Sequence, residues 1–461
     1  MAVLGAFLVP HPPIILPEIG RGEEKKIQKT IGAYREAARR AAELRPETVV
    51  LTSPHATAYS DYFHISPGET ARGDFARFGA PEVALSARYD AALAEKISEI
   101  AAERGLPAGT QGERDAALDH GTLIPLRFLQ EAFSGFRIVR IGLSGLSPVE
   151  HYRLGKCIAQ AAGALGRRVV FVASGDLSHR LKEDGPYGFA PQGPEFDSRV
   201  TKAMAEGDFL ELLTFAPALC ERAGECGLRS FQIMAGALDG LAVRPELLSY
   251  EGPFGVGYGV AAFAVEGADD ARRFDLLLEA GERARLEAAR AGEDACVRLA
   301  RLSLETYVKT GRYAKLPPDL PQELLGRRAG AFVSLKKFGR LRGCIGTVDA
   351  QTPSLAEEIL ENAVSAGTRD PRFPRVTREE LPELSYSVDV LGEPEKINSA
   401  AELDVKRYGV IVRSGSRRGL LLPDLEGVDT PEEQLAIAMR KGRIRQGEPV
   451  TLERFEVVRH K

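Results

Sequence analysis

Short apolar runs alternate with longer amphipathic segments through the first 265 residues, and this alternation restricts the possible folds more than any other feature. The run at 48–53 (TVVLTS) is apolar and β-branched, which is typical of a buried strand, and the segment at 148–163 has helical periodicity. Such alternation predicts an α/β domain with a largely parallel sheet covered by helices on both faces. Strands are expected at 2–10, 48–53, 137–143, 168–173 and 257–265, and helices at 23–44, 148–163 and 227–241.

The composition changes after residue 268, where a stretch rich in Ala, Arg, Glu and Leu continues to Gly311 with helical spacing. Beyond the prolines at 317–321, strand-like and helix-like segments are interleaved, which is typical of a separate, smaller α+β domain. We therefore expect an N-terminal domain at 1–265, a connecting helix at 266–289 and a second domain at 290–461.

Charge and cysteine content argue against several classes of protein. The 61 basic and 65 acidic residues give a net charge of −4, which offers no reason to expect nucleic acid or an anionic membrane as a partner. No apolar run reaches the ~18 residues that span a bilayer, and His11 and two prolines interrupt the apolar N-terminus, so we expect a first strand there rather than a signal peptide. The five cysteines lack CxxC spacing, which argues against a disulfide framework and a structural zinc site and favours the cytoplasm.

Four of the seven histidines occupy one kind of position. His11, His55 and His179 each follow a predicted strand, and His120 precedes an apolar helix-like run. In an open parallel sheet, ligands bind beyond the carboxyl ends of the strands, so these imidazoles are expected to converge there. A convergent set of imidazoles serves either a metal ion or a proton-shuttling site without metal.

Glu225, in AGECGLRSF, is the candidate for a third metal ligand. Two histidines and one carboxylate on one face of Fe(II) leave positions open for O2 and substrate. An acidic residue at the start of a helix also stabilises the helix dipole without any chemistry, so spacing alone leaves both roles open. The adjacent Cys226 could ligate a softer metal, or it could be a small buried apolar residue.

Four motifs occur in order along the first domain: PHPP at 10–13, SPH at 53–55, DHG at 119–121 and SGDLSH at 174–179. With them, residues 1–265 resemble the LigB superfamily of class III extradiol dioxygenases and the related Memo-like proteins. The resemblance implies Fe(II) held by His11, His55 and Glu225. It also implies that His179 takes a substrate proton and steadies bound oxygen, that His120 is its acid–base partner, and that a small catecholic or related aromatic compound is cleaved with O2.

The Memo-like relatives imply a second possibility for the metal. In them a cysteine near the carboxylate position takes part in metal binding, and Cys226 occupies such a position here, so copper or another first-row divalent metal is an alternative to iron. The Gly/Pro-rich segment 183–197 follows His179. It is either a loop over the site, with Tyr187 and Phe189 as contacts for an aromatic ring, or an ordinary surface loop.

The stretch LRGCIGT at 341–347 is the most distinctive part of the second half. With RDPRF (369–373), SYSVDVL (385–391), YGVIV (408–412) and LLPDLEGVDT (421–430), it resembles the AMMECR family over residues 290–461, which indicates a fold more than an activity. Cys344 could be a nucleophile, but a structural thiol is favoured because no histidine lies between His179 and His460. A small anion-binding patch, or an ordinary solvated face, could be formed by Arg342, Arg369, Asp370 and Arg372.

A Memo-like domain joined to an AMMECR domain resembles two components of the AmmeMemoRadiSam system, whose third member is a radical SAM protein. The sequence has no cysteine triplet suited to an iron–sulfur cluster, so radical chemistry would lie in such a partner. This resemblance implies an alternative function: a metal-binding accessory protein without ring-cleavage activity.

Overall fold

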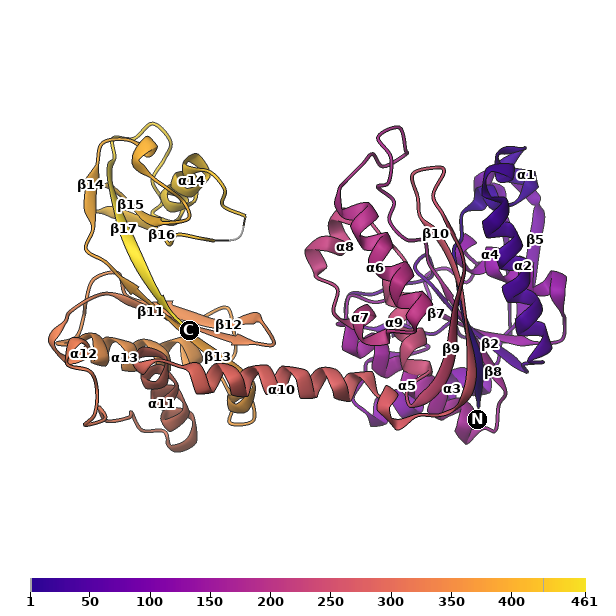
Figure 1. Ribbon diagram of the computed structural model, residues 1–461, viewed down its shortest axis with the longest axis horizontal. Coiled ribbons are helices and arrows are strands. Elements are labelled where there is room, and N and C mark those ends of the chain that lie inside the picture. The colour runs from indigo at the N-terminus through magenta and orange to yellow at the C-terminus, as the bar shows by residue number, and fades with distance from the viewer. Residues whose placement is uncertain (1, 426) are drawn as a thin grey trace. The chain divides into compact units, whose positions relative to one another are not determined.

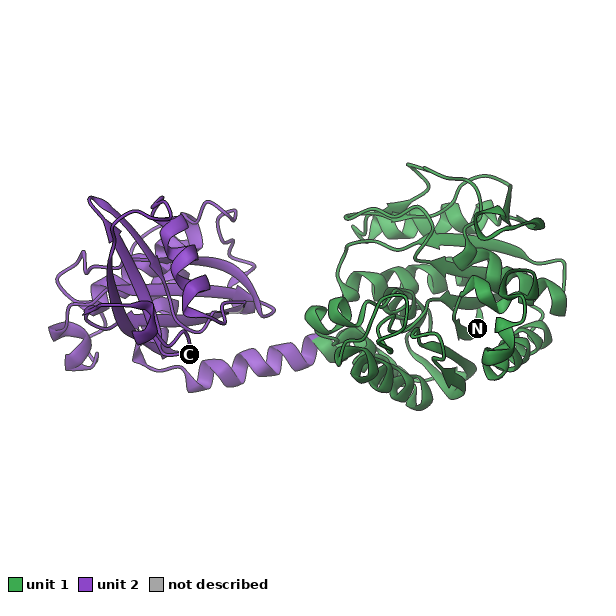
Figure 2. Ribbon diagram, turned by 90° about the horizontal axis from the view of Figure 1, so that it is seen from above, with its two compact units in different colours: residues 1–278 green, residues 279–461 purple. Residues whose placement is uncertain are grey.

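The computed structural model describes residues 2–425 and 427–461. The chain divides into two compact units, residues 1–278 and 279–461 (Figure 2). Helix α10 (Phe274–Gly292) runs across the division between them. Among the described residues, no helix combines the length and apolar character that crossing a membrane requires.

The first unit is built on a six-stranded sheet with the order β7-β2-β8-β1-β10-β9. The strands from β7 to β1 are parallel, and β10 and β9 extend the sheet in antiparallel orientation. The expected α/β fold with a largely parallel sheet is thus confirmed, and β9 is the one strand of this sheet that the sequence pattern missed. The bounds are β1 Val3–Val9, β2 Thr48–Ser53, β7 Arg137–Gly142, β8 Val169–Ser174, β9 Leu241–Glu251 and β10 Tyr258–Ala268.

Helices cover both faces of this sheet (Figure 1). Alternate side chains of β1 enter different cores: Leu8 packs with residues of α3, α5 and α9, and Phe7 packs with residues of α2 and α4. Because a hydrophobic core lies on each face of the sheet, its strands carry apolar side chains on both sides. The helices of the unit are α1 Pro17–Gly20, α2 Gln28–Glu43, α3 Ala91–Glu103, α4 His120–Ala132, α5 Pro148–Ala164, α6 Gln192–Glu206, α7 Phe209–Leu213, α8 Pro217–Ala223 and α9 Leu228–Ala237.

Two small pairs of strands lie outside the main sheet. The hairpin of β4 (Thr70–Phe75) and β5 (Ala80–Arg88) is joined by the short 3-10 helix Ala76–Phe78, and β3 (Phe63–His64) pairs with β6 (Ala108–Gly109). The hairpin brings Phe78 to the site described below.

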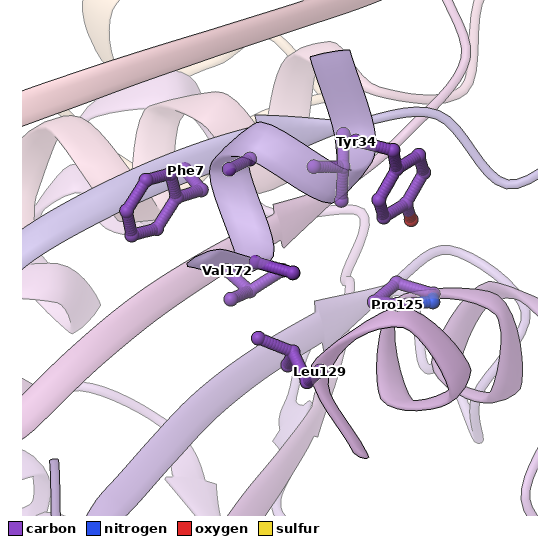
Figure 3. Close-up of a pocket in the computed structure, with 8 residues that line it drawn as sticks. Phe7, Tyr34, Pro125, Leu129 and Val172 are labelled. Atoms are coloured by element: carbon purple, nitrogen blue, oxygen red, sulfur yellow. The ribbon is translucent and has the colours of Figure 1, made fainter. Parts of the chain in front are cut away.

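A small apolar cavity lies between the sheet and the helices α2 and α4 (Figure 3). Its volume is about 10 Å³, which is room for at most one water molecule. Tyr34 is the one polar residue in the wall of the cavity. The Tyr34 hydroxyl is already paired, because it donates to Pro10 O at 2.9 Å. The cavity is therefore a packing defect and not a ligand site.

The second unit is an antiparallel sheet with the order β12-β11-β13-β17-β15-β16, in which β14 also pairs with β17. Capping boxes at Ser354 and Thr430 start α13 and α14. A separate α+β domain after the first is confirmed. Its strands are β11 Ala331–Lys337, β12 Arg340–Gly346, β13 Leu384–Leu391, β14 Glu395–Ile397, β15 Tyr408–Ser414, β16 Arg417–Leu421 and β17 Thr451–His460, and its helices are α11 Ala295–Thr310, α12 Gln322–Gly326, α13 Leu355–Thr368 and α14 Pro431–Lys441.

Candidate metal centre

His11 and His55 meet beyond the carboxyl ends of β1 and β2. Their Nε2 atoms lie 3.0 Å apart, and their ring planes are 82° from parallel. Two nitrogen ligands that are each about 2.0–2.1 Å from one ion lie about 2.8–3.4 Å apart when they subtend about 90–110°. The two imidazoles therefore have the separation that a shared first-row ion requires.

The hydrogen bonds of Ser174 fix the tautomer of His11. Ser174 Oγ donates its proton to Gly121 O at 2.6 Å, so it accepts at its other contact, with His11 Nδ1 at 2.9 Å. Nδ1 of His11 must then carry the proton, which leaves a lone pair on Nε2. An imidazole oriented in this way by its other nitrogen is the arrangement found at protein metal sites.

Cys226 supplies the third donor near the two imidazoles. Its Sγ lies 3.6 Å from His11 Nε2, and the ligand atoms of His11, His55 and Cys226 all lie within 4.8 Å of one another. Burial, with a smaller effect of Asp176, raises the pKa of the Cys226 thiol, so the metal-free thiol keeps its proton. A bound cation deprotonates a coordinating thiol, so metal binding here would release a proton.

Close backbone contact brings Cys226 into this place. A Cβ on Gly175 would lie 2.1 Å from the Cα of Gly227, so the turn after β8 and the start of α9 touch. Asp176 follows that turn, and its backbone N–H donates to Cys226 Sγ at 3.3 Å. The carboxylate of Asp176 is buried and accepts from the backbone N–H of His11 at 2.8 Å, and burial raises its pKa to about 6.

Glu225, the carboxylate expected as the third ligand, is not brought together with His11 and His55. Its Oε2 accepts from the backbone N–H of Leu228 at 2.8 Å, at the first turn of α9. This is the helix-terminal role that the sequence left open. The sulfur of the next residue, Cys226, takes the place beside the imidazoles.

His120 lies against the other two imidazoles. Its ring centroid is 4.1 Å from that of His55 and 5.4 Å from that of His11. It is the first residue of α4, and the carboxylate of Asp119 caps this helix by accepting from Thr122 N–H. On its outer side the half-exposed ring of Phe78 packs edge-on, 5.2 Å away.

His179 is half-buried, and its Nε2 atom is buried without a hydrogen-bond partner within the described chain. Its ring stacks on Tyr187 with a centroid distance of 5.1 Å, and Tyr187 itself is 60% exposed. A buried polar atom without a partner indicates a place where a ligand or an ordered water binds. The loop after His179 thus places one exposed aromatic ring, that of Tyr187, next to an unsatisfied imidazole, and Phe189 of the same loop is also exposed.

The imidazoles of this cluster are neutral at neutral pH. Burial, together with the neighbouring His55, lowers the pKa of His11 to about 3, and the same two causes lower the pKa of His120 to about 3. Burial also lowers the pKa of His179. Neutral imidazole is the form that binds a metal ion or accepts a proton.

The sequence of the chain has relatives among known proteins. The LigB family, described as the catalytic LigB subunit of aromatic ring-opening dioxygenase, matches residues 5–261. The chain belongs to the LigB family. The AMMECR1 family matches residues 297–460, so the expected order of a LigB domain followed by an AMMECR domain is confirmed.

The similar sequences and structures each match a different share of this chain. A protein of Clostridium acetobutylicum is 42% identical over 469 residues, which is 100% of both chains. A Thermotoga maritima protein is 51% identical over 172 residues, covering 37% of this chain and 99% of its own. The crystal structure of an uncharacterized protein from Pyrococcus horikoshii matches at 35% identity with a TM-score of 0.33, covering 36% of this chain and 88% of that one.

Sequence reasoning missed the side chains that orient the cluster. Ser174, which contacts the His11 ring, stands in the SGDLSH motif, and Ser53, which contacts the His55 backbone N–H, stands in SPH, but a serine in a motif gives no sign of which group it contacts. Arg140, buried in β7, also went unnoticed, because a single arginine in an apolar run resembles an exposed position.

In the AMMECR domain, Cys344 has a polar surrounding. Ser334 Oγ donates to its Sγ at 3.2 Å, its backbone N–H donates to Asp370 Oδ2 at 2.9 Å, and Arg372 contacts its carbonyl oxygen at 3.2 Å. Of the four residues for which the sequence left an anion-binding patch or a solvated face open, Arg372 pairs with Asp370 at 2.7 Å while its side chain stays 55% exposed, and Arg342 pairs with Glu380 at 2.9 Å. Carboxylates thus already neutralise these two guanidinium groups. A separate group, Asp294, Cys296 and His460, also lies within 4.8 Å, but Asp294 there caps the N-terminus of α11, whose dipole disfavours a cation.

Proposed function

We propose that His11, His55 and Cys226 bind a first-row transition metal and that the LigB domain is a non-haem, dioxygenase-like oxidoreductase acting with O2 on a catecholic or related aromatic compound. The observation that carries this proposal is the 3.0 Å separation of the two Nε2 atoms, of which that of His11 carries a lone pair because its proton is held on Nδ1. His55 is exposed, so an ion at this place would keep a side open to small molecules. Fe(II) is the ion that the family resemblance implies.

A bound iron would supply the exchange of electrons between a catechol and O2. The chain's own residues would bind and deprotonate the substrate. His179 offers an unpaired Nε2 to a substrate hydroxyl, and Tyr187 extends the aromatic surface beside it. The neutral ring of His120 would be a second proton acceptor next to His55, and the ring of Phe78 packs against it.

A second candidate function is favoured by the sulfur in the donor set. Thiolate and imidazole ligands suit copper and zinc as well as iron. In this alternative the chain is a metal-binding accessory protein that acts with a radical SAM partner and cleaves no ring. The placement of Cys226, 3.6 Å from His11 Nε2, supports it.

Two arrangements of the site are distinguished by their third ligand, which is either Cys226 or Glu225. A site made with Cys226 needs only the loss of the thiol proton, since its sulfur already lies beside the imidazoles. A site made with Glu225 needs its carboxylate to leave the Leu228 N–H. Cys226→Ser and Glu225→Gln test the two directly, and Cys220→Ser, on α8, is a matched control for loss of a thiol.

The experiment is anaerobic purification of the full chain, metal analysis, and O2 uptake with a panel of catechols. Bound iron together with ring-opened product supports the dioxygenase. One bound metal per chain without O2 uptake supports the accessory function. Metal content that stays unchanged in both His11→Ala and His55→Ala would contradict both proposals.

A further inference from the structure

Arg140 is the largest fully buried side chain of the protein. It lies on β7, in the run RIVRIG, where its neighbours are apolar, and its side chain is 1% exposed. Burying a guanidinium costs several kcal/mol unless its donors are paired. What those donors contact therefore shows what the arginine does.

The guanidinium holds the irregular segment that precedes α4. Nη1 donates to Ala117 O at 2.6 Å, and Nη2 donates to Asp115 O at 3.0 Å and to Glu113 Oε1 at 3.4 Å. The remaining donor, Nε, contacts Ser66 Oγ at 2.7 Å. Most of segment 113–117 is exposed and has no regular secondary structure. Its backbone is therefore held in place by the buried guanidinium and not by packing of its own side chains.

Asp119 lies two residues after this segment and connects the two sides of the metal centre. Asp119 Oδ1 accepts from Ser53 Oγ at 2.5 Å, and Ser53 Oγ in turn accepts from the His55 backbone N–H at 3.2 Å. The same carboxylate caps the helix that begins with His120. Arg140 Nη1 lies 3.8 Å from Asp119 Oδ2 and so also neutralises this charge.

We infer that Arg140 is a positioning residue of the metal centre: it places Asp119, which sets the backbone of His55 on one side and the start of α4, with His120, on the other. The inference rests on the proposed function for the importance of the two imidazoles. Its structural part concerns the metal-free protein and can be tested there. Arg140 touches no metal donor itself.

The test compares Arg140→Met and Arg140→Lys with a control variant that removes a different partner of the same guanidinium. Ser66→Ala removes the contact of Nε and leaves the three bonds to segment 113–117 intact. Two quantities are measured in the full chain: the nitrogen resonances of the histidine rings without metal, and the affinity for Co2+ as the probe. Arg140→Lys keeps the charge and guards against the case in which the methionine variant does not fold.

Arg140→Met is expected to shift the ring resonances of His55 and His120 and to weaken Co2+ binding about 10-fold, the lower end of the range for loss of a direct partner of a metal ligand, because Arg140 acts through Asp119. Arg140→Lys is expected to restore part of the affinity, and Ser66→Ala to match the wild type. The inference is overturned if the arginine variants leave both resonances and affinity unchanged, or if Ser66→Ala changes them equally. If the wild type binds no Co2+, the proposed function fails, whereas the ring resonances still decide the role of Arg140.

Discussion

The Nε2 atoms of His11 and His55 lie 3.0 Å apart, although 44 positions separate the two residues in the sequence. The strands that precede them, β1 and β2, are not neighbours in the sheet, because β8 lies between them. The parallel order places all three carboxyl ends at one edge, and β8 delivers Ser174, which orients His11. The meeting of the two imidazoles is thus a consequence of strand order as much as of the histidines themselves.

Ser174→Ala should weaken metal binding without removing a ligand. The variant loses the acceptor that keeps the proton of His11 on Nδ1, so the lone pair on Nε2 is no longer fixed. We expect about a 10-fold or greater rise in the dissociation constant for Co2+. Isothermal titration of the full chain measures it, and Ser98→Ala, which removes a serine bond on α3, is the control. Equal affinities in the two variants would refute the role of Ser174.

Gly121→Ala should damage the site while a comparable change elsewhere does not. A Cβ at Gly121 would lie 2.4 Å from Ser53 Oγ and 3.3 Å from His55 Cδ2, so the ligand and its support must move. Gly32, on α2, has open space around its Cβ position, and Gly32→Ala should keep metal affinity and stabilise the helix by up to about 1 kcal/mol. Thermal unfolding and metal content of both variants give the comparison. Full metal binding by Gly121→Ala would show that the glycine is not required.

Asp197 should make the first unit less stable as pH rises from about 4 to about 7. Burial raises the pKa of this carboxyl to about 7, although the Tyr250 hydroxyl and the Ser178 N–H oppose the shift. The folded state then keeps a proton that the unfolded state loses near pH 4. Its contribution is full below about pH 4 and is lost as pH rises through about 7, with a slope of up to about 1.4 kcal/mol per pH unit.

Asp197→Asn tests this dependence, because the amide does not titrate. Hydrogen exchange of the β10 amides, measured across this pH range, reports the opening free energy of the first unit. The difference between wild type and variant should change with pH in the direction given above. A difference that stays constant from pH 4 to 7 would contradict the raised pKa.

Tyr187→Leu should affect substrate and not metal. Tyr187 stacks on His179 and is largely exposed, so its ring is available to a bound aromatic compound. Loss of one aromatic contact of about 0.5–1.5 kcal/mol corresponds to a rise in KM of about 2- to 10-fold. Steady-state O2 uptake gives KM, and metal analysis of the same sample should give the wild-type value. Unchanged KM would mean that the loop does not contact the substrate.

The buried strands of the main sheet could be predicted from the sequence. Five of the six strands of the main sheet have apolar runs such as TVVLTS, and their placement at one edge predicted where the imidazoles would meet. The strand β9 escaped notice because its side chains are only partly buried and it carries Pro245 within an alternating pattern. The β4–β5 hairpin is similarly exposed on one side, so it has no continuous apolar run.

The third donor could not be chosen from the sequence. Glu225 and Cys226 are adjacent, so spacing places both at the site, and only the direction of each side chain separates them. The Leu228 N–H at the start of α9 holds the carboxylate of Glu225, whereas the sulfur of Cys226 lies 3.6 Å from His11 Nε2, where the turns at Gly175 and Gly227 touch. Side-chain direction at a turn depends on such local contacts, which a residue pattern does not encode.

X-ray absorption of the metal-loaded chain tests the central claim most directly. The account predicts one ion per chain, with nitrogen neighbours at about 2.0–2.1 Å and one sulfur at about 2.3 Å. The sulfur signal should disappear in Cys226→Ser and remain in Glu225→Gln. A bound ion with the same neighbours in His11→Ala, or no stoichiometric ion in the wild type, would contradict the account.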